Sequence, residues 1–166
     1  MSTERPLVSF CLLFYNHRQY FEAALEGAFA QTYRPLEIVI SDDGSTDGSA
    51  ELVQNYVTAH APFDITIVFN HNAHNLGILG NWTKAASLSH GELLFMVGGD
   101  DISLPDRAEK VVAAWMADDK RAVSDIVFVQ DCNWDKHLGH AEPVIRALRT
   151  SSRSSAAGKT YAKTAF

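Results

Sequence analysis

Two short apolar runs, each followed by a pair of carboxylates, constrain the fold of this chain most strongly. Residues 93–97 (LLFMV) have the length and composition of a buried strand, and they lead through two glycines to an acidic pair at 100–101. Residues 36–40 (LEIVI) lead in the same way to an acidic pair at 42–43. Ligands of open α/β sheets bind in the crevice beyond the carboxyl ends of the strands, so the sequence predicts a site there.

Apolar strand-like runs alternate with segments of helical periodicity along most of the chain. The predicted strands cover residues 7–14, 36–40, 65–69, 93–97 and 126–129. The predicted helices lie around residues 21–29, 53–57, 82–88 and 108–116, and residues 71–80 are predicted to form a loop. This alternation predicts an α/β fold in which helices flank a mostly parallel central sheet with right-handed crossovers.

Length and charge limit the class of protein. The 166 residues fit one domain, predicted at 1–140, followed by a Ser- and Ala-rich basic tail or linker at 141–166 with no packed element expected after Thr150. The net charge of -6 argues against nucleic-acid binding, because phosphate contacts need clustered Lys and Arg. The N-terminus has neither a signal-peptide nor a membrane-spanning pattern, and two cysteines give no disulfide framework, so a cytoplasmic location is expected.

Polar and acidic groups follow four of the predicted strands, and they converge if those strands are neighbours. These groups are Tyr15 and Asn16, Asp42 and Asp43, Asn75 and Gly77, and Gly99, Asp100 and Asp101. An aromatic ring, carboxylate acceptors and glycines that allow close approach together suit a nucleoside. Carboxylates repel phosphate by roughly 4 kcal/mol at about 4 Å in a medium of dielectric near 20, and a divalent cation removes that conflict. Neither a Walker phosphate loop nor a dinucleotide-binding glycine motif is present.

Four motifs in order resemble those of the family 2 glycosyltransferases, which are inverting enzymes of the GT-A fold. The resemblance covers roughly residues 7–140 and is carried by VSFCLLFYN, AFAQTYRPLEIVISDDGSTDGS and NLGILGNWTKAASLSHGELLFMVGGDDISLPDRAEK. It implies a Rossmann-like GT-A domain at 1–140, the nucleotide-sugar-binding part of a metal-dependent enzyme. Such an enzyme moves a sugar from a nucleoside diphosphate to a hydroxyl acceptor with inversion.

The resemblance also implies roles for individual residues. Tyr15 is expected to stack on or flank the nucleobase, Asp43 to accept a hydrogen bond from its imide edge, and Asp42 to support the ribose or the loop. Asp100 matches the family's metal-binding carboxylate and Asp101 is its neighbour, with Mg²⁺ or Mn²⁺ as the cofactor. The remaining predicted nucleotide-binding residues are Asn16, Asn75, Gly77 and Gly99.

The chain departs from the family pattern at three places. Gly98 stands where many members have the first Asp of the metal motif, and Leu13 and Phe14 replace a Pro-Thr or similar pair. Family members keep their catalytic base downstream of the metal motif, whereas Asp131 and Asp135 match the region before that base. We therefore assign no catalytic base from the sequence.

The donor is expected to be UDP- or dTDP-linked and the acceptor a saccharide or a lipid-linked saccharide. Peripheral association with the inner face of the membrane is compatible with this role. The alternative function is a catalytically incomplete, glycosyltransferase-like module that binds nucleotide for regulation or assembly, which the departure at Gly98 and the unassigned base favour.

Structural explanations exist for several of these residues. Each acidic pair can cap a helix or complete a turn, and Tyr15 can pack rather than stack. His71 and His74, like His137 and His140, have a metal-compatible spacing but lie in predicted loops, where solvated histidines are more common. Trp82 and Trp115 are expected to pack, whereas Trp134 lies where an acceptor would pass.

Overall fold

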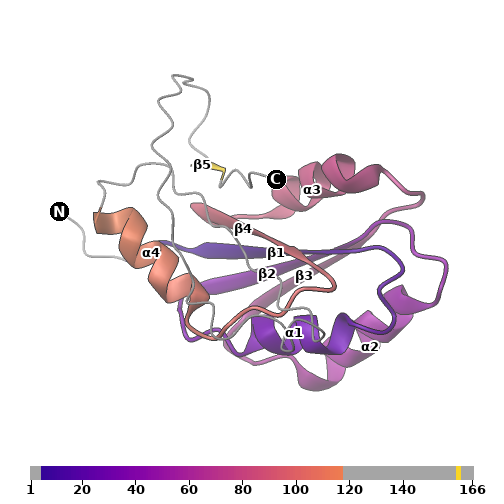
Figure 1. Cartoon of the computed structure of the whole chain (residues 1–166), viewed down its shortest axis with the longest axis horizontal. Helices are drawn as coiled ribbons and strands as arrows, with labels where there is room; N and C mark the ends of the chain where they lie inside the picture. Colours follow the sequence, from indigo (N-terminus) through magenta and orange to yellow (C-terminus); the bar gives the residue numbers. More distant parts are fainter. Residues whose placement is uncertain (1–4, 118–159, 162–166) are drawn as a thin grey trace, which may run out of the picture.

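The computed structural model describes residues 5–117 and the strand at Thr160–Tyr161, and Figure 1 shows their arrangement. The strands are β1 (Val8–Phe14), β2 (Leu36–Asp42), β3 (Thr66–His71), β4 (Leu93–Gly98) and β5 (Thr160–Tyr161). The helices are α1 (Phe21–Phe29), α2 (Ser49–His60), α3 (Gly77–Leu88) and α4 (Arg107–Ala117). The strands form one sheet in the order β3-β2-β1-β4-β5, and every pairing is parallel.

The centre of the sheet is β1, which pairs with β2 on one side and β4 on the other. Leu13 lies opposite Ser41 of β2 and Gly98 of β4, so the carboxyl ends of the three strands are level. The chain runs outward from β1 through β2 to β3 and then returns to place β4 on the opposite side. This reversal makes the carboxyl end of β1 a topological switch point, where α/β proteins bind ligands.

Helices cover both faces of the sheet, which explains why the strands are continuously apolar. Phe10 and Phe95 stack with ring centroids 4.9 Å apart, in the core that α1, α2 and α4 cover. Cys11 and Leu94 point to the opposite face, where α3 covers them. Figure 1 shows α3 across the sheet from α1 and α2. Each fully buried large apolar side chain contributes about 1.5–3 kcal/mol, so both layers stabilise the sheet.

The predicted alternation of strands and helices is confirmed over the described residues, with two corrections. Residues 77–80, predicted as loop, form the first turn of α3, because Gly77 (φ 75°) turns the chain and its N–H donates to Asn75 Oδ1 at 2.8 Å. A strand, β5, lies after Thr150, where no element was expected, and its pairing with Leu93 and Leu94 is a long-range contact that no local pattern reveals. The predicted strand at 126–129 lies outside the described residues.

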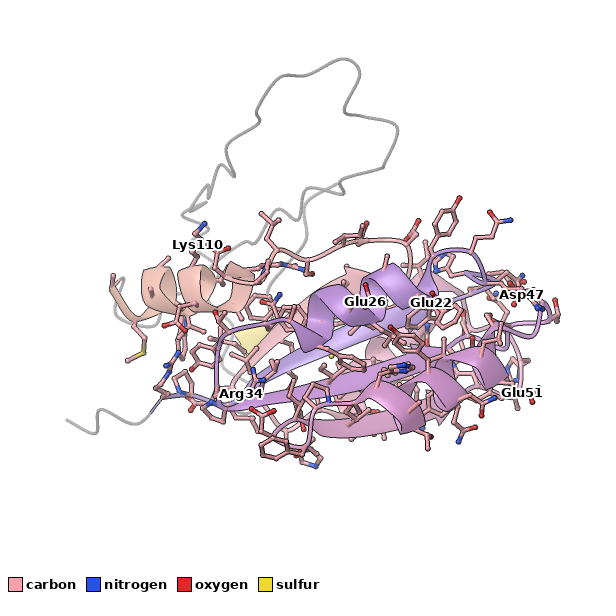
Figure 2. The ribbon with its side chains drawn as sticks, turned by 90° about the horizontal axis from the view of Figure 1, so that it is seen from below. Glu22, Glu26, Arg34, Asp47, Glu51 and Lys110 are labelled. Atoms are coloured by element: carbon pink, nitrogen blue, oxygen red, sulfur yellow. The ribbon has the colours of Figure 1, made fainter. Side chains whose placement is uncertain are left out.

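The surface formed by α1 and α2 is acidic. Figure 2 views the chain from this side and shows Glu22 and Glu26 on α1, Glu51 on α2 and Asp47 at the loop before α2. Arg34 pairs with Asp64 at 2.7 Å, an exposed contact of the kind worth at most about 1 kcal/mol. Neither α1 nor α2 contains a Lys or Arg. None of the helices in residues 5–117 is both long and apolar enough to cross a membrane.

Candidate functional site

A cavity of about 640 Å³ opens at the switch point of the sheet. Its walls come from the ends of β1 and β4, the residue after β2, and the start of α3. Six of the predicted site residues line it: Tyr15, Asp43, Asn75, Gly77, Asp100 and Asp101. Loops far apart in the sequence therefore meet here, as the predicted parallel sheet requires.

Asp43 is the buried carboxylate of the cavity and is held by two hydrogen bonds. It is 3% exposed, and its Oδ1 accepts from the backbone N–H of Leu76 at 2.8 Å and from Asn72 Nδ2 at 3.0 Å. Its own N–H donates to Phe14 O at 2.8 Å, which joins the ends of β1 and β2. The two hydrogen bonds occupy Oδ1 of Asp43 and leave its Oδ2 as the remaining acceptor.

Asp42 and Asn16 do not line the cavity, although both were predicted to bind nucleotide. Asp42 is fully buried and accepts from Ser45 N at 2.9 Å, while its Oδ2 lies 2.7 Å from His71 Nδ1. Asn16 adopts a left-handed backbone (φ 56°), and its Oδ1 accepts from Thr46 N at 2.9 Å. Of the two roles expected for Asp42, the structure places it in the support of the loop, and Asn16 fastens the neighbouring loop to it.

A buried chain of amide and hydroxyl groups supports Asp43, and sequence analysis did not identify it. Asn81 Oδ1 accepts from Ser41 Oγ at 2.6 Å and from Asn72 Nδ2 at 3.1 Å, and Asn70 Nδ2 donates to Ser41 Oγ at 3.0 Å. Asn72 and Asn81 are 6% and 3% exposed, so these hydrogen bonds are shielded from water. The sequence does carry one signal of this chain: Asn70 and Asn72 stand at alternate positions after an apolar run, and alternate side chains of a strand lie on the same face.

The second acidic pair forms a tight turn at the end of β4. Asp101 N donates to Gly98 O at 3.1 Å, and Gly98 N donates to Asp101 Oδ2 at 3.1 Å. Burial raises the pKa of Asp101 above its usual value, and the charge of Asp100 adds to this, while the Gly98 hydrogen bond opposes it. Asp100 is exposed. A nearby cation would favour the charged form of Asp101.

This donor set suits a hard divalent cation. Mg²⁺ and Mn²⁺ favour carboxylate oxygens, and Mg²⁺ is commonly held by one or two carboxylates together with substrate phosphates. Within residues 5–117, no three His, Cys, Asp or Glu side chains are grouped so that they hold an ion by themselves. A divalent cation held by Asp100 and Asp101 would therefore need its other ligands from outside these two side chains.

Glycine is required beside this turn because the backbone lies against two rings. A Cβ on Gly99 would be 2.6 Å from His17 Nδ1 and closer still to the ring of Phe14. A Cβ on Gly98 would be 2.7 Å from Asp100 Oδ1. Gly99 thus brings the acidic turn against the end of β1, although it does not itself line the cavity.

The loop after the acidic turn is anchored to the end of α1. Gln31 Nε2 donates to Leu104 O at 2.6 Å, and Gln31 Oε1 accepts from Ala108 N at 3.1 Å. Thr32 N donates to Pro105 O at 2.8 Å. Because Gln31 is only 2% exposed, these bonds form a rigid support that holds Asp100 and Asp101 at the mouth of the cavity.

Comparison with known proteins decides the family. The sequence model described as "Glycosyl transferase family 2" matches residues 9–161, nearly the whole chain. The chain belongs to this family. Two relatives are an uncharacterized glycosyltransferase of Nostoc sp., 31% identical over 127 residues, and the abequosyltransferase RfbV of Salmonella typhimurium, 33% identical over 102 residues.

These family 2 relatives are longer than this chain. The matched region is 76% of this chain and 38% of the Nostoc protein, and 60% of this chain and 30% of the Salmonella protein. The chain therefore spans about a third of the length of the relatives that it matches.

Solved structures show the same fold. A mannosyltransferase from Pyrobaculum calidifontis, in complex with GDP-Man and Mn²⁺, superposes with a TM-score of 0.67 at 24% identity, over 75% of this chain and 36% of that chain. TarS 1–349 of S. aureus in complex with UDP-GlcNAc gives 0.56 at 22% identity, over 67% of this chain and 31% of that chain. The fold of this family 2 chain is that of the GT-A glycosyltransferases.

Proposed function

We propose that this chain is the nucleotide-sugar-binding part of a metal-dependent, inverting glycosyltransferase. The observation that carries the proposal is one cavity at the switch point with Asp43 on one wall and the pair Asp100 and Asp101 on another. A nucleoside diphosphate has a base with hydrogen-bond donors at one end and an anionic diphosphate at the other. Its two ends match the two acidic parts of the cavity once a cation accompanies the diphosphate.

The base end is formed by Tyr15 and Asp43. The Tyr15 ring is 44% exposed and lines the cavity, so a planar base can cover it without moving the core. Asp43 Oδ2 accepts from the imide N–H of uracil or thymine, while Oδ1 stays bonded to the protein. This arrangement supports a UDP- or dTDP-linked donor, and GDP belongs in the test because one structural neighbour binds GDP-Man.

The diphosphate end is formed by Asp100 and Asp101, which would hold Mg²⁺ or Mn²⁺. When bound, the cation neutralises the diphosphate and stabilises its negative charge as it departs. Asp100, being exposed, meets the ion from the cavity mouth, and Asp101 is fixed by Gly98 N–H beside it. No base is assigned for the acceptor hydroxyl, because Asp131 and Asp135 lie outside the described residues.

The proposed domain spans residues 1–140, with 141–166 as a tail or linker. A saccharide or lipid-linked saccharide is the proposed acceptor, and the proposed location is the cytoplasm, including the inner face of the membrane. No nucleic acid is proposed as a partner, because the α1 and α2 surface is acidic.

Thermal unfolding with UDP, dTDP and GDP, each with Mn²⁺ or with EDTA, tests the proposal. At a hundredfold excess over the dissociation constant a ligand adds about 2.7 kcal/mol to the free energy of unfolding. We expect at least one diphosphate to raise the melting temperature with Mn²⁺ and not with EDTA. No shift with any of the three would overturn nucleotide binding, and equal shifts in EDTA would overturn the role of the metal.

A catalytically incomplete module that binds nucleotide without transferring sugar is the second candidate. It is favoured by Gly98, which removes a carboxylate that many family members have at this position. Incubation with labelled nucleotide sugars and a panel of saccharide acceptors separates the two functions. Metal-dependent binding without any glycoside product supports the module, whereas a transferred sugar supports the enzyme.

A further inference from the structure

His17 is a cavity residue that the proposed function does not yet use. It lies in the loop between β1 and α1 and lines the cavity beside Phe14 and Tyr15. Its ring meets Phe14 edge-on at a centroid distance of 6.2 Å and Tyr20 edge-on at 6.5 Å. Its carbonyl accepts from the N–H groups of Tyr20 and Phe21 at the start of α1. Ring and backbone are thus both held in place before any ligand arrives.

The two nitrogens of the ring have different surroundings. Nδ1 is buried against Gly99 and has no hydrogen-bond partner within the described part of the chain. The residue as a whole is partly exposed and lines the cavity, and Nε2, unlike Nδ1, is not among the described buried polar atoms that lack a partner, so Nε2 is the nitrogen accessible from the cavity. A buried N–H without an acceptor is rarer in proteins than a buried lone pair without a donor. In the neutral ring, the tautomer with its proton on Nε2 is therefore favoured, which makes the cavity-facing nitrogen a donor.

The rest of the cavity needs such a donor. Three carboxylates line it (Asp43, Asp100 and Asp101), and none of its described lining residues is Lys or Arg. The nearest cation along the chain, Arg18, is held away by its bond to Asp47 O at 3.0 Å. A diphosphate in this cavity would find a metal on one side and carboxylates around it. His17 is the one imidazole in the described lining, and it is the side chain that offers a ring N–H to the phosphate oxygens.

We infer that His17 Nε2 donates a hydrogen bond to the terminal phosphate of the bound nucleoside diphosphate. The terminal phosphate is chosen because His17 lies against Gly99, beside the acidic turn that is proposed to hold the cation. His17 is not assigned to the metal, because Nε2 carries the ring proton in the favoured tautomer and so has no lone pair to offer an ion. The inference rests on the proposed function, because it places a contact within the same nucleotide site.

The test compares a diphosphate with its monophosphate in matched variants. UDP, dTDP and GDP are first compared on the wild-type chain. The one that binds most tightly, and then its monophosphate, is titrated calorimetrically in the presence of Mn²⁺. His17→Phe keeps a ring between Phe14 and Tyr20 but removes both nitrogens, and His17→Gln restores an N–H donor. His60→Phe, in α2 and outside the cavity lining, controls for loss of a histidine elsewhere. Melting curves confirm that each variant is folded.

We expect His17→Phe to weaken the diphosphate about tenfold to a hundredfold, as loss of a hydrogen bond to a charged group does. The monophosphate should change by less than about threefold, since it lacks the second phosphate. His17→Gln should recover most of the loss, and His60→Phe should bind like the wild type. If His17→Phe is unfolded, His17→Ala serves in the same comparison.

Two results would overturn the inference while leaving the proposed function intact. One is an unchanged diphosphate affinity in a folded His17→Phe chain, and the other is an equal loss for diphosphate and monophosphate. If the wild-type chain binds none of the three diphosphates, that result overturns the proposed function itself. The two failures are therefore distinguishable in one set of titrations.

Discussion

Each end of the sheet holds a carboxylate with a shifted pKa, and the two shifts have opposite signs. At the amino end, Glu37 of β2 is 3% exposed and accepts from Ser9 Oγ and from the N–H groups of His90 and Gly91. Burial acts to raise the pKa of Glu37, but these hydrogen bonds outweigh it and the pKa lies below its usual value. At the carboxyl end, burial raises the pKa of Asp101, which accepts a single backbone hydrogen bond within residues 5–117, from Gly98 N–H.

The difference separates a carboxylate that stabilises the fold, Glu37, from one that is proposed to bind a ligand, Asp101. Glu37 obtains its partners within the protein, so its charge contributes to the stability of the fold by joining β1, β2 and the start of β4. Among the described residues Asp101 accepts one backbone hydrogen bond, from Gly98 N–H, and a cation at the proposed site would add a favourable interaction with Asp101 and its exposed neighbour Asp100. A carboxylate that is costly in the empty protein is favourable once the ligand is bound.

Removal of Glu37 should give the largest effect. Glu37→Ala leaves the Ser9 hydroxyl and the His90 backbone N–H without their acceptor, whereas the Gly91 N–H keeps Ser9 Oγ at 2.8 Å, and we expect the free energy of unfolding to fall by about 3 kcal/mol. Urea denaturation measures this loss, Glu37→Gln should lose less because it keeps an acceptor, and exposed Glu51→Ala should change stability by less than about 0.5 kcal/mol. A loss below about 1 kcal/mol for Glu37→Ala would show that the carboxylate does not stabilise the amino end of the sheet.

Asp43→Asn should affect nucleotide affinity next most strongly. The amide keeps Oδ1 as acceptor for Leu76 and Asn72 but removes the charge, so we expect diphosphate binding to weaken by roughly ten- to a hundredfold with little change in melting temperature. Asp47→Asn, on the same loop but outside the cavity lining, is the matched control in calorimetric titrations. A lowered melting temperature with unchanged affinity would return Asp43 to a purely structural role.

The acidic turn should divide its roles between neighbours. We expect Asp100→Asn to weaken Mn²⁺-dependent diphosphate binding about tenfold, and more than Asp101→Asn does, because Asp100 faces the cavity mouth from an exposed position. Binding measured in EDTA should be the same for both variants and the wild type. A larger loss for Asp101→Asn would identify the half-buried carboxylate as the main ligand of the ion.

The pH dependence of stability should show the smallest effect, with opposite signs at the two ends. The lowered folded pKa of Glu37 adds stability above its unfolded value near 4.5, and that stability is lost as pH falls through the folded pKa. The raised folded pKa of Asp101 has the opposite consequence, since its ionisation weakens the fold as pH rises above the unfolded value of 3.8. Asp101→Asn should therefore stabilise the metal-free chain at pH 7, and Glu37→Gln should reduce the loss of folding stability as the pH falls. Urea denaturation between about pH 3 and pH 7 measures both, and destabilisation by Asp101→Asn at pH 7 would contradict the assigned sign.

The strands and the place of the site followed from local sequence, because a parallel strand covered on both faces must be continuously apolar. Residues 36–40 and 93–97 met that requirement, and the acidic pairs after them lie at the predicted edge. The start of α3 and the strand β5 were not predicted from the local sequence. The first depends on the turn at Gly77 and the second on pairing with β4, and neither produces periodicity in the chain.

The sequence by itself determined that carboxylates and an aromatic ring meet at the carboxyl ends of a parallel sheet. Only the tertiary structure decided which member of the first pair faces the cavity. Asp42 ends β2 and points into its own loop, whereas Asp43, one residue later, faces the cavity. It also brought His17 against Gly99 and tied Asn72 and Asn81 to Asp43. The physical reason is that side-chain direction and burial depend on contacts between distant segments, which residue type and spacing do not specify.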